Sequence, residues 1–252
     1  MKYLFVALIL CFFFGCSQKE TPDPFIQIQD EKARAIIRAS IEHAGGMERW
    51  KKIKRLRYTK DFQLLLASGE TEKTYEQMHD YQYDPLLIDI RSVENGQEIH
   101  TQLKDDVYTR TINGDPAEAT QEALAKAVNT STYVVSMPFK LLDPGAQITY
   151  EGETSMHDGR VVDVIRVDYN AQQHDNHSTT DTWKYYFDKE DRKIVANWVK
   201  TSDHYSLVEN VSFVQAGGIL FNRERKSYRV DSLGNRLWLR ADYIYDNYMI
   251  SY

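Results

Sequence analysis

The residues of this chain that could do chemistry are few and lie mostly in polar segments. The stretch His174-Asp175-Asn176-His177, followed by Asp181, has side chains of the kind that bind transition metals. These donors fall in a polar loop between two predicted strands, and no third ligand on a rigid element is evident. A solvated loop is the simpler interpretation, so we predict no metal site.

Candidate catalytic groups are equally sparse. Asp105-Asp106 pairs two carboxylates only in sequence, because adjacent strand residues point to opposite faces. There is no G-x-S-x-G elbow, phosphate-cradling loop or dinucleotide fingerprint. His43 lies in the last turn of a predicted helix, where a histidine commonly interacts favourably with the C-terminal end of the helix dipole. We predict no catalytic residue, no cofactor and no enzyme; a hydrolase with residues gathered from several strands is the less favoured alternative.

One cysteine has a predicted modification. Lys2 precedes an apolar run over residues 3–14, which is shorter than the roughly 20 residues that cross a bilayer. The run ends at Gly15-Cys16, and a small residue directly before a cysteine resembles the lipobox of bacterial lipoproteins. Phe13 departs from that pattern, in which leucine is commoner. The resemblance implies that residues 1–15 are a signal peptide and that Cys16 is the lipid attachment site.

Acylation of Cys16 would place the protein on a membrane without a spanning segment. We expect a lipid-anchored protein of the cell envelope, with Ser17 compatible with the outer membrane. Whether it faces the periplasm or the surface stays open. The alternatives are a plain secretory signal cut elsewhere or an N-terminal membrane anchor.

The charge and cysteine content limit the kinds of partner and of covalent chemistry that the chain could have. The formal charge of −6 becomes more negative once Lys2 is removed, which argues against nucleic acid or anionic lipid as the main partner. Cys11 leaves with the signal peptide and Cys16 carries lipid, so no thiol remains for a disulfide or a nucleophile. The predicted domain therefore depends on packing alone, and any protein partner is unknown.

The elements that must position a site begin with a helix. Residues 16–29 are interpreted as an acylated N-terminus and tether, and residues 30–252 as a single domain. Asp30 is a plausible N-cap, and the positions that follow have helical spacing: Ala33, Ile36, Ile37, Ile41 and Ala44. Gly45-Gly46 is typical of a C-cap. One further helical turn follows, with Trp50 as its anchor.

Beyond Trp50 the apolar period changes to two. Leu56, Tyr58, Phe62 and Leu64 alternate with polar residues, as in a half-buried strand. Turn residues such as Asn113-Gly114 divide the region up to residue 112 into about five strands. A second helix over 117–128, capped by Asp115, then interrupts the pattern. Six or seven further strands are predicted, near 146–154, 160–169, 182–188, 193–201, 205–215, 219–230 and 236–248.

This order predicts the fold class. Short connections make the sheet antiparallel, and a sheet this wide must curl or close. We predict a mainly β (α+β) fold: a strongly curved antiparallel sheet or unclosed barrel of about 11–12 strands with two covering helices. Aromatic and apolar residues on the strand faces are candidates for lining a cavity beneath the helices: Phe62, Leu64, Tyr81, Tyr83, Trp183, Tyr185, Tyr243 and Tyr245.

The same order of elements resembles the bacterial lipoprotein-carrier superfamily (LolA and LolB). The likeness spans residues 30–248 and is nearest to uncharacterised outer-membrane lipoproteins of Bacteroidota. Its motifs are His43-Ala44-Gly45-Gly46 with Trp50, the run 137–145, Tyr150-Glu151-Gly152, Asp158-Gly159-Arg160 and Asp181-Thr182-Trp183. The resemblance implies an unclosed barrel with a helical lid over an apolar cavity, and it supplies no catalytic residues.

Two functions follow as hypotheses. The first is a membrane-anchored protein that binds a lipid, a lipidated protein or another amphiphile in an apolar cavity, as in lipid or lipoprotein trafficking. The second is a non-enzymatic envelope module with a solid interior that binds a protein or glycan at its surface. An unfilled cavity or a packed interior would discriminate between them.

Overall fold

A computed structural model describes residues 23–94, 96–169 and 181–252. The predicted signal peptide, Cys16 and the stretch His174-Asp175-Asn176-His177 lie outside the described residues. Within the described part, the helices are α1 (Glu31–His43), α2 (Met47–Trp50) and α3 (Gln121–Val135), with 3-10 turns η1 (Pro24–Gln27) and η2 (Phe139–Leu142).

The strands form two groups along the chain. The first group is β1 (Arg55–Leu65), β2 (Thr71–Tyr83), β3 (Leu86–Glu94), β4 (Gln97–Lys104), β5 (Val107–Ile112) and β6 (Asp115–Pro116). The second is β7 (Ala146–Ser155), β8 (Val161–Tyr169), β9 (Thr182–Asp188), β10 (Ile194–Lys200), β11 (Tyr205–Ala216), β12 (Ile219–Val230) and β13 (Arg236–Ser251).

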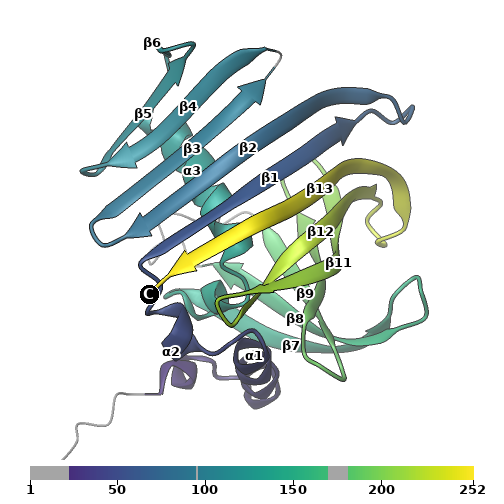
Figure 1. Ribbon diagram of the computed structural model, residues 1–252. Helices are drawn as coiled ribbons and strands as arrows, with labels where there is room; N and C mark the ends of the chain where they lie inside the picture. Colours follow the sequence, from purple (N-terminus) through teal and green to yellow (C-terminus); the bar gives the residue numbers. More distant parts are fainter. Residues whose placement is uncertain (1–22, 95, 170–180) are drawn as a thin grey trace, which may run out of the picture.

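All of these strands belong to one 13-stranded antiparallel sheet that is strongly curved (Figure 1). Its order is β6-β5-β4-β3-β2-β1-β13-β12-β11-β10-β9-β8-β7, so the last strand pairs with the first. The two edge strands, β6 and β7, follow one another in the chain and are joined through α3. The barrel therefore stays open where the helix is inserted, which confirms the predicted fold class.

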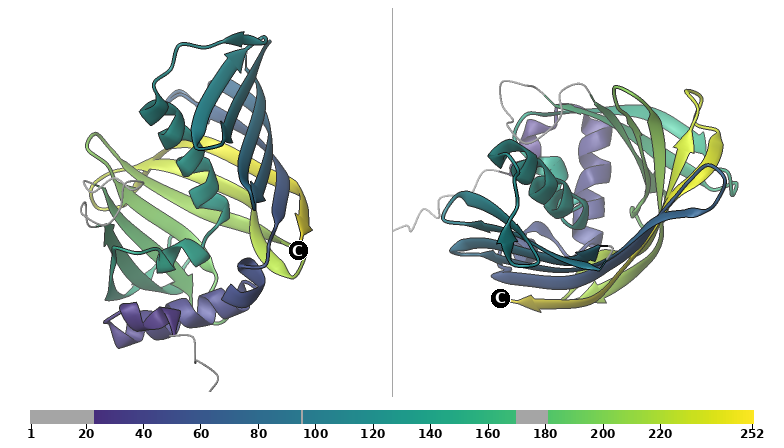
Figure 2. Two further views of the ribbon diagram at one scale, coloured as in Figure 1. Left: turned by 90° about the vertical axis from the view of Figure 1, so that its left-hand side faces the viewer. Right: turned by 90° about the horizontal axis from the view of Figure 1, so that it is seen from above.

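The two longer helices occupy different places relative to this sheet (Figure 2). Seen from above, α3 lies within the space that the sheet curves around, and α1 lies across one end. The Asp30 side chain accepts a hydrogen bond from the Ala33 backbone amide at 3.0 Å, which confirms the predicted cap. The buried face of α1 belongs to the main core, together with Phe25 and Ile28 from the segment before it. The packed fold thus includes residues before 30.

The start of α3 differs from the prediction. The helix begins at Gln121 and is capped by Thr120, whose hydroxyl accepts from the Ala123 amide at 3.2 Å. Asp115-Pro116 forms β6 instead, because the Asn113-Gly114 turn continues the hairpin. Both turn residues have positive φ, 52° and 88°, as in the tight turns that suit twisted hairpins.

The motif around Gly45 and Trp50 has a packing role at the end of the barrel. The Ala44 carbonyl accepts from the Leu220 amide at 2.9 Å, and Arg49 Nη1 donates to the Gly218 carbonyl at 2.9 Å. Both contacts fix α1 and α2 against the turn between β11 and β12. Trp50 stacks on Phe139 of η2 with ring centroids 4.5 Å apart. These contacts bring together segments that are far apart in the sequence.

In residues 23–94, 96–169 and 181–252, none of the helices has the length and apolarity that crossing a bilayer requires.

Candidate functional site

A cavity of about 590 Å³ lies on the concave face of the sheet. Its lining comes from nearly every strand between β2 and β12, from β1 and β13, and from α3. The volume falls within the range of small-molecule binding pockets, roughly 300–1,000 Å³. The described interior is therefore not completely filled by its own side chains.

Helix α3 covers this cavity and is held by hydrogen bonds to both halves of the sheet. The Tyr81 hydroxyl on β2 donates to Ser131 at 3.1 Å. On the other side, the Tyr133 hydroxyl lies 2.8 Å from that of Tyr169 on β8 and 2.5 Å from that of Tyr185 on β9. The helix thus bridges the open side of the barrel through buried tyrosines.

The sequence-predicted candidates divide into two sets. Trp183, Tyr185, Tyr243 and Tyr245 line the cavity. Ligand binding by these four side chains stays a prediction.

The other four candidates are placed elsewhere. Tyr81 is fully buried, with its hydroxyl near those of Tyr58 and Ser131. Phe62 stacks on Tyr75 with ring centroids 4.3 Å apart, Tyr83 packs against the main core, and Leu64 on β1 is half-buried. The described lining of the cavity contains none of Phe62, Leu64, Tyr81 and Tyr83.

The lining is more polar than the sequence suggested. Beside aromatic and aliphatic side chains it contains His79, His204, Asn197, Asn210, Lys60, Arg110, Arg225 and Glu94. Glu94 is neutralised by Lys73, whose ammonium lies 3.2 Å away. Its described charged groups therefore have a cationic excess, and the predicted apolar cavity is better described as amphipathic.

Sequence reasoning missed Lys60 and Arg225. Lys60 occupies an inward position of β1 between Tyr58 and Phe62, so a charged residue that interrupts an apolar face was the available signal there. Arg225 is only 8 % exposed, but the other β12 residues in the cavity lining are the polar Asn222 and Ser227, so the pattern of β12 gave no such signal.

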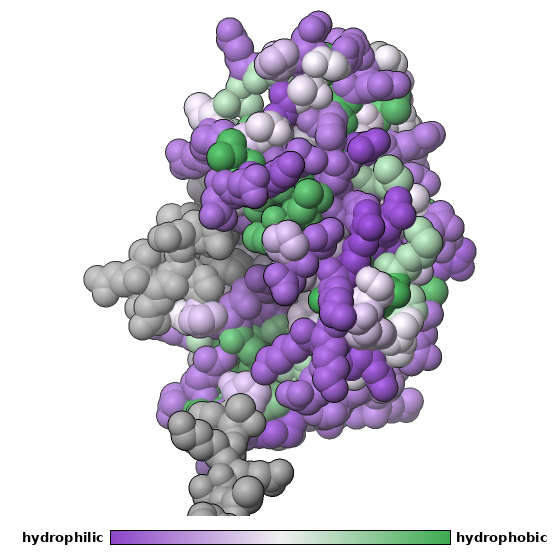
Figure 3. All heavy atoms as spheres, turned by 60° about the vertical axis from the view of Figure 1, so that its left-hand side comes forward, coloured by the Kyte–Doolittle hydropathy of each residue, from purple (hydrophilic) through white to green (hydrophobic). Residues whose placement is uncertain are grey.

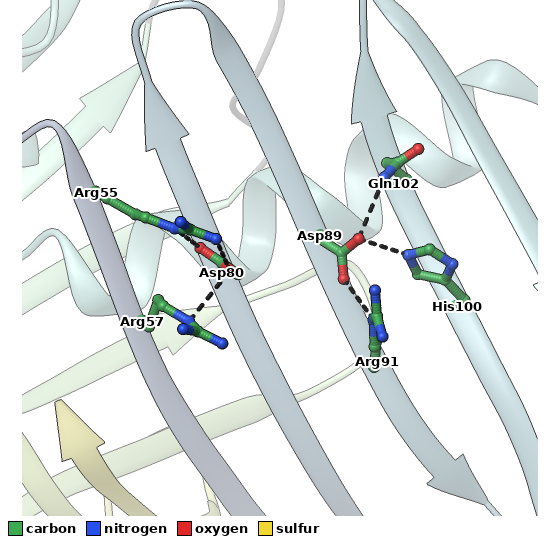
Figure 4. Close-up of polar contacts among 7 residues, drawn as sticks. All are labelled: Arg55, Arg57, Asp80, Asp89, Arg91, His100 and Gln102. Carbon is green, nitrogen blue, oxygen red and sulfur yellow. Dashed lines mark hydrogen bonds and ion pairs between the residues drawn. The ribbon is translucent and has the colours of Figure 1, made fainter. Parts of the chain in front are cut away.

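The convex face carries a different polar arrangement, drawn in Figure 4. Asp80 on β2 lies opposite Asp89 on β3 in the sheet register, and each carboxylate contacts basic side chains of its own. Arg55 donates to both oxygens of Asp80 at 2.7 and 2.6 Å, and His100 Nε2 lies 2.7 Å from Asp89. Although burial opposes it, hydrogen bonds from His100 and Arg91 hold the pKa of Asp89 below its ordinary value. Asp89 is thus ionised at neutral pH and is unsuited to act as a general acid.

The other chemical candidates are also located. Asp105 and Asp106 form the turn between β4 and β5, with φ of 51° and 60°. His43 is exposed in the last turn of α1. In the part of the chain that the structure describes, no group of three or more His, Cys, Asp or Glu side chains could hold a metal. The predicted absence of an enzyme activity stays a prediction.

The molecular surface offers a further comparison between the two functional hypotheses. On the face drawn in Figure 3, hydrophobic side chains of the described residues lie in separate patches among hydrophilic ones. Isolated apolar side chains of this kind are ordinary on a protein surface. This face therefore lacks the broad apolar patch, among its described residues, that a hydrophobic docking surface would present.

Comparisons with known proteins were made at the level of sequence and of structure. No protein-family model matches the chain, and no curated protein matches it. Among solved structures, a DUF1329 family protein from Desulfovibrio piger matches with a TM-score of 0.54 and 9 % identity, covering 87 % of this chain and 93 % of that one.

Two other matches are more distant. A LolA superfamily protein from Nitrosomonas europaea has a TM-score of 0.46 and 10 % identity, covering 87 % of this chain and 94 % of that one. The lipoprotein LppX from Mycobacterium tuberculosis has a TM-score of 0.32 and 12 % identity, covering 85 % and 94 %. The relationship to lipoproteins of Bacteroidota stays a prediction. The chain has a fold similar to that of the DUF1329 family protein: a curved antiparallel sheet, unclosed in its described part, with helices.

Proposed function

We propose that this chain is a membrane-anchored lipoprotein that binds a lipid, a lipidated protein or another amphiphile in the cavity under α3. The observation that carries the proposal is the unfilled space of about 590 Å³ on the concave face. Aromatic side chains on β9 and β13 offer apolar surface to an acyl chain, and each buried CH₂ contributes roughly 0.8 kcal/mol.

The anchoring part of the proposal depends on Cys16. A diacylglycerol on this residue would hold the domain at the surface of a membrane, within reach of the amphiphiles it binds. We propose the outer membrane as the site of anchoring, because Ser17 is compatible with it. Trafficking of envelope lipids or lipoproteins is the role that fits such a tethered binding protein.

The competing function is a surface-binding envelope module with a solid interior. The cavity volume and the mixed surface in Figure 3 both favour the amphiphile-binding role. A catalytic role is less supported, because Glu94 is the one carboxylate among the described cavity-lining residues and it is paired with Lys73.

The direct test is to identify what the protein carries. All described helices and strands lie between Pro24 and Ser251, so a chain beginning at Ser17 retains them. This chain, called the unacylated chain below, is purified from an exported, detergent-free preparation and extracted with organic solvent. Mass spectrometry of the extract should reveal a stoichiometric amphiphile. An empty protein that also fails to take up a fluorescent fatty acid would contradict the proposed function.

A further inference from the structure

Lys60 and Arg225 are two of the cationic side chains in the cavity whose charges are not neutralised by any described residue; Arg110, which donates to the Thr101 hydroxyl at 2.9 Å, is a third. No carboxylate oxygen of the described chain lies within 4.0 Å of the Lys60 ammonium or the Arg225 guanidinium. Both side chains line the cavity. Burying a charge without a counter-ion is costly, so such a pair calls for an explanation beyond packing.

Arg225 is oriented by neutral amides. Its Nε donates to the Asn210 side-chain oxygen at 2.8 Å, and its Nη2 donates to that of Asn197 at 3.2 Å. The Asn210 amide nitrogen in turn donates to the Ile194 carbonyl at 2.6 Å, which directs the amide oxygen toward the guanidinium. A guanidinium has five N–H donors, and these two bonds leave the rest without a partner in the described chain.

Lys60 is held by aromatic rings. Its ammonium lies 4.5 Å from the ring centroid of Phe62, 5.4 Å from that of Tyr243 and 5.8 Å from that of Tyr245. These cation–π contacts orient the ammonium but leave its full positive charge available.

The two cations flank the same aromatic strand. In the sheet register Arg225 on β12 is opposite Tyr243 on β13, and Lys60 on β1 is opposite Tyr245. Tyr243 and Tyr245 have ring centroids 6.3 Å apart and both line the cavity. Lys60 and Arg225 therefore approach the cavity from the two strands on either side of β13.

We infer that Lys60 and Arg225 form an anion-binding subsite inside the cavity, so that the amphiphile carries a carboxylate or phosphate head group that binds there. Charge-assisted hydrogen bonds from the free guanidinium N–H groups and the ammonium would hold such oxygens. The acyl part would then extend along the aromatic lining. This inference rests on the proposed function and specifies the class of its ligand.

The test compares ligands that differ only in the head group. The unacylated chain is titrated with a long-chain fatty acid and with the alcohol of the same chain length, and with acetate and inorganic phosphate alone. We expect the fatty acid to bind roughly tenfold or more tightly than the alcohol. The Lys60→Met variant should lose most of that preference and keep its affinity for the alcohol.

A matched control is available on the convex face. Lys184 also lies over an aromatic ring, 5.6 Å from that of Trp198, but it does not line the cavity. Lys184→Met should therefore keep the full preference for the acid. Arg225→Gln is a second test of the subsite, with cooperative urea unfolding as the criterion that each variant is folded.

Four outcomes would overturn the inference. Equal affinity for acid and alcohol contradicts the subsite but leaves amphiphile binding intact. A preference that neither Lys60→Met nor Arg225→Gln reduces contradicts the assignment of the residues. Binding of acetate or phosphate as tight as that of the fatty acid indicates a free-anion site instead of a head-group site. Absence of binding by every ligand contradicts both the subsite and the proposed function.

Discussion

The Tyr81 hydroxyl on β2 donates a hydrogen bond to Ser131 on α3 at 3.1 Å, within a buried cluster that also contains His79. This contact fixes the covering helix to one half of the sheet, while Tyr133 fixes it to the other half. Tyrosine suits both purposes, because its ring packs in the core and its hydroxyl finds a polar partner. The position of the helix over the cavity therefore depends on specific hydroxyl groups.

Removal of the Tyr81 hydroxyl should weaken the attachment of α3 to the sheet. Tyr81→Phe leaves buried partners without a hydrogen bond and should lower the free energy of unfolding by about 1–3 kcal/mol. Hydrogen exchange of the α3 amides should become faster. Tyr108→Phe is the control, because the Tyr108 hydroxyl has no partner among the described residues. Equal stability of the two variants would show that the Tyr81 contact does not hold the helix.

Gly45 should tolerate no side chain. It has φ of 117°, and an added Cβ would lie 2.3 Å from the Gly218 carbonyl oxygen. Gly69 also has positive φ, 87°, but open space around it. Gly69→Ala should cost roughly 1–2 kcal/mol of unfolding free energy, and Gly45→Ala a further 1–3 kcal/mol. Urea unfolding measures both, and indistinguishable variants would contradict the close contact with the β11–β12 turn.

Because His79 is buried, we expect the free energy of unfolding to depend on pH. Burial, assisted by the charge of Lys60, lowers the pKa of His79 to about 3. The unfolded chain, with an ordinary histidine pKa near 6.5, binds the proton more readily, so acid favours unfolding. The stabilisation that the buried neutral His79 gives is complete above about pH 6.5. As the pH falls from there toward about 3, the free energy of unfolding decreases by about 1.4 kcal/mol per pH unit. Unfolding of the native chain and of His79→Gln should therefore converge in acid, whereas parallel pH profiles would contradict a buried neutral imidazole.

The proposed lipid anchor at Cys16 leads to a separate prediction. Cys16→Ala in the full chain should abolish the mass increase of acylation and release the protein from the membrane fraction. Cys11→Ala is the matched control and should leave both properties unchanged, because bulky Leu10 precedes Cys11. Mass spectrometry and membrane fractionation provide the two readouts. A Cys16→Ala chain that stays membrane-bound would indicate another kind of anchor.

Local patterns predicted most of the strands closely. The predicted strands over 182–188 and 219–230 coincide with β9 and β12, because polar and apolar residues alternate there between clear turn residues. The Asp30 cap was equally readable, since a capping side chain and its amide partner are three residues apart. Such features depend on neighbours in the sequence.

The features that the sequence did not reveal depend on long-range pairing. Nothing in the alternation of β1 and β13 specifies that these strands pair, which places Lys60 beside Tyr245. The predicted start of α3 was wrong. Asp115 is a residue type that commonly caps helices, but here it pairs with Ile112 in the β5–β6 hairpin. The polar character of the cavity likewise appears only once Asn197, Asn210 and Arg225 meet across three strands.

The unfilled cavity is the claim on which the functional account depends, and a single pair of variants tests it. Val208 lines the cavity from β11, whereas its neighbour Leu207 does not. In titrations of the unacylated chain with a fluorescent fatty acid, we predict one bound molecule per chain for the native protein and for Leu207→Trp. Val208→Trp, still folded by urea unfolding, should bind more than tenfold more weakly, a loss of at least about 1.4 kcal/mol. Unchanged binding by Val208→Trp would contradict a ligand site in this cavity.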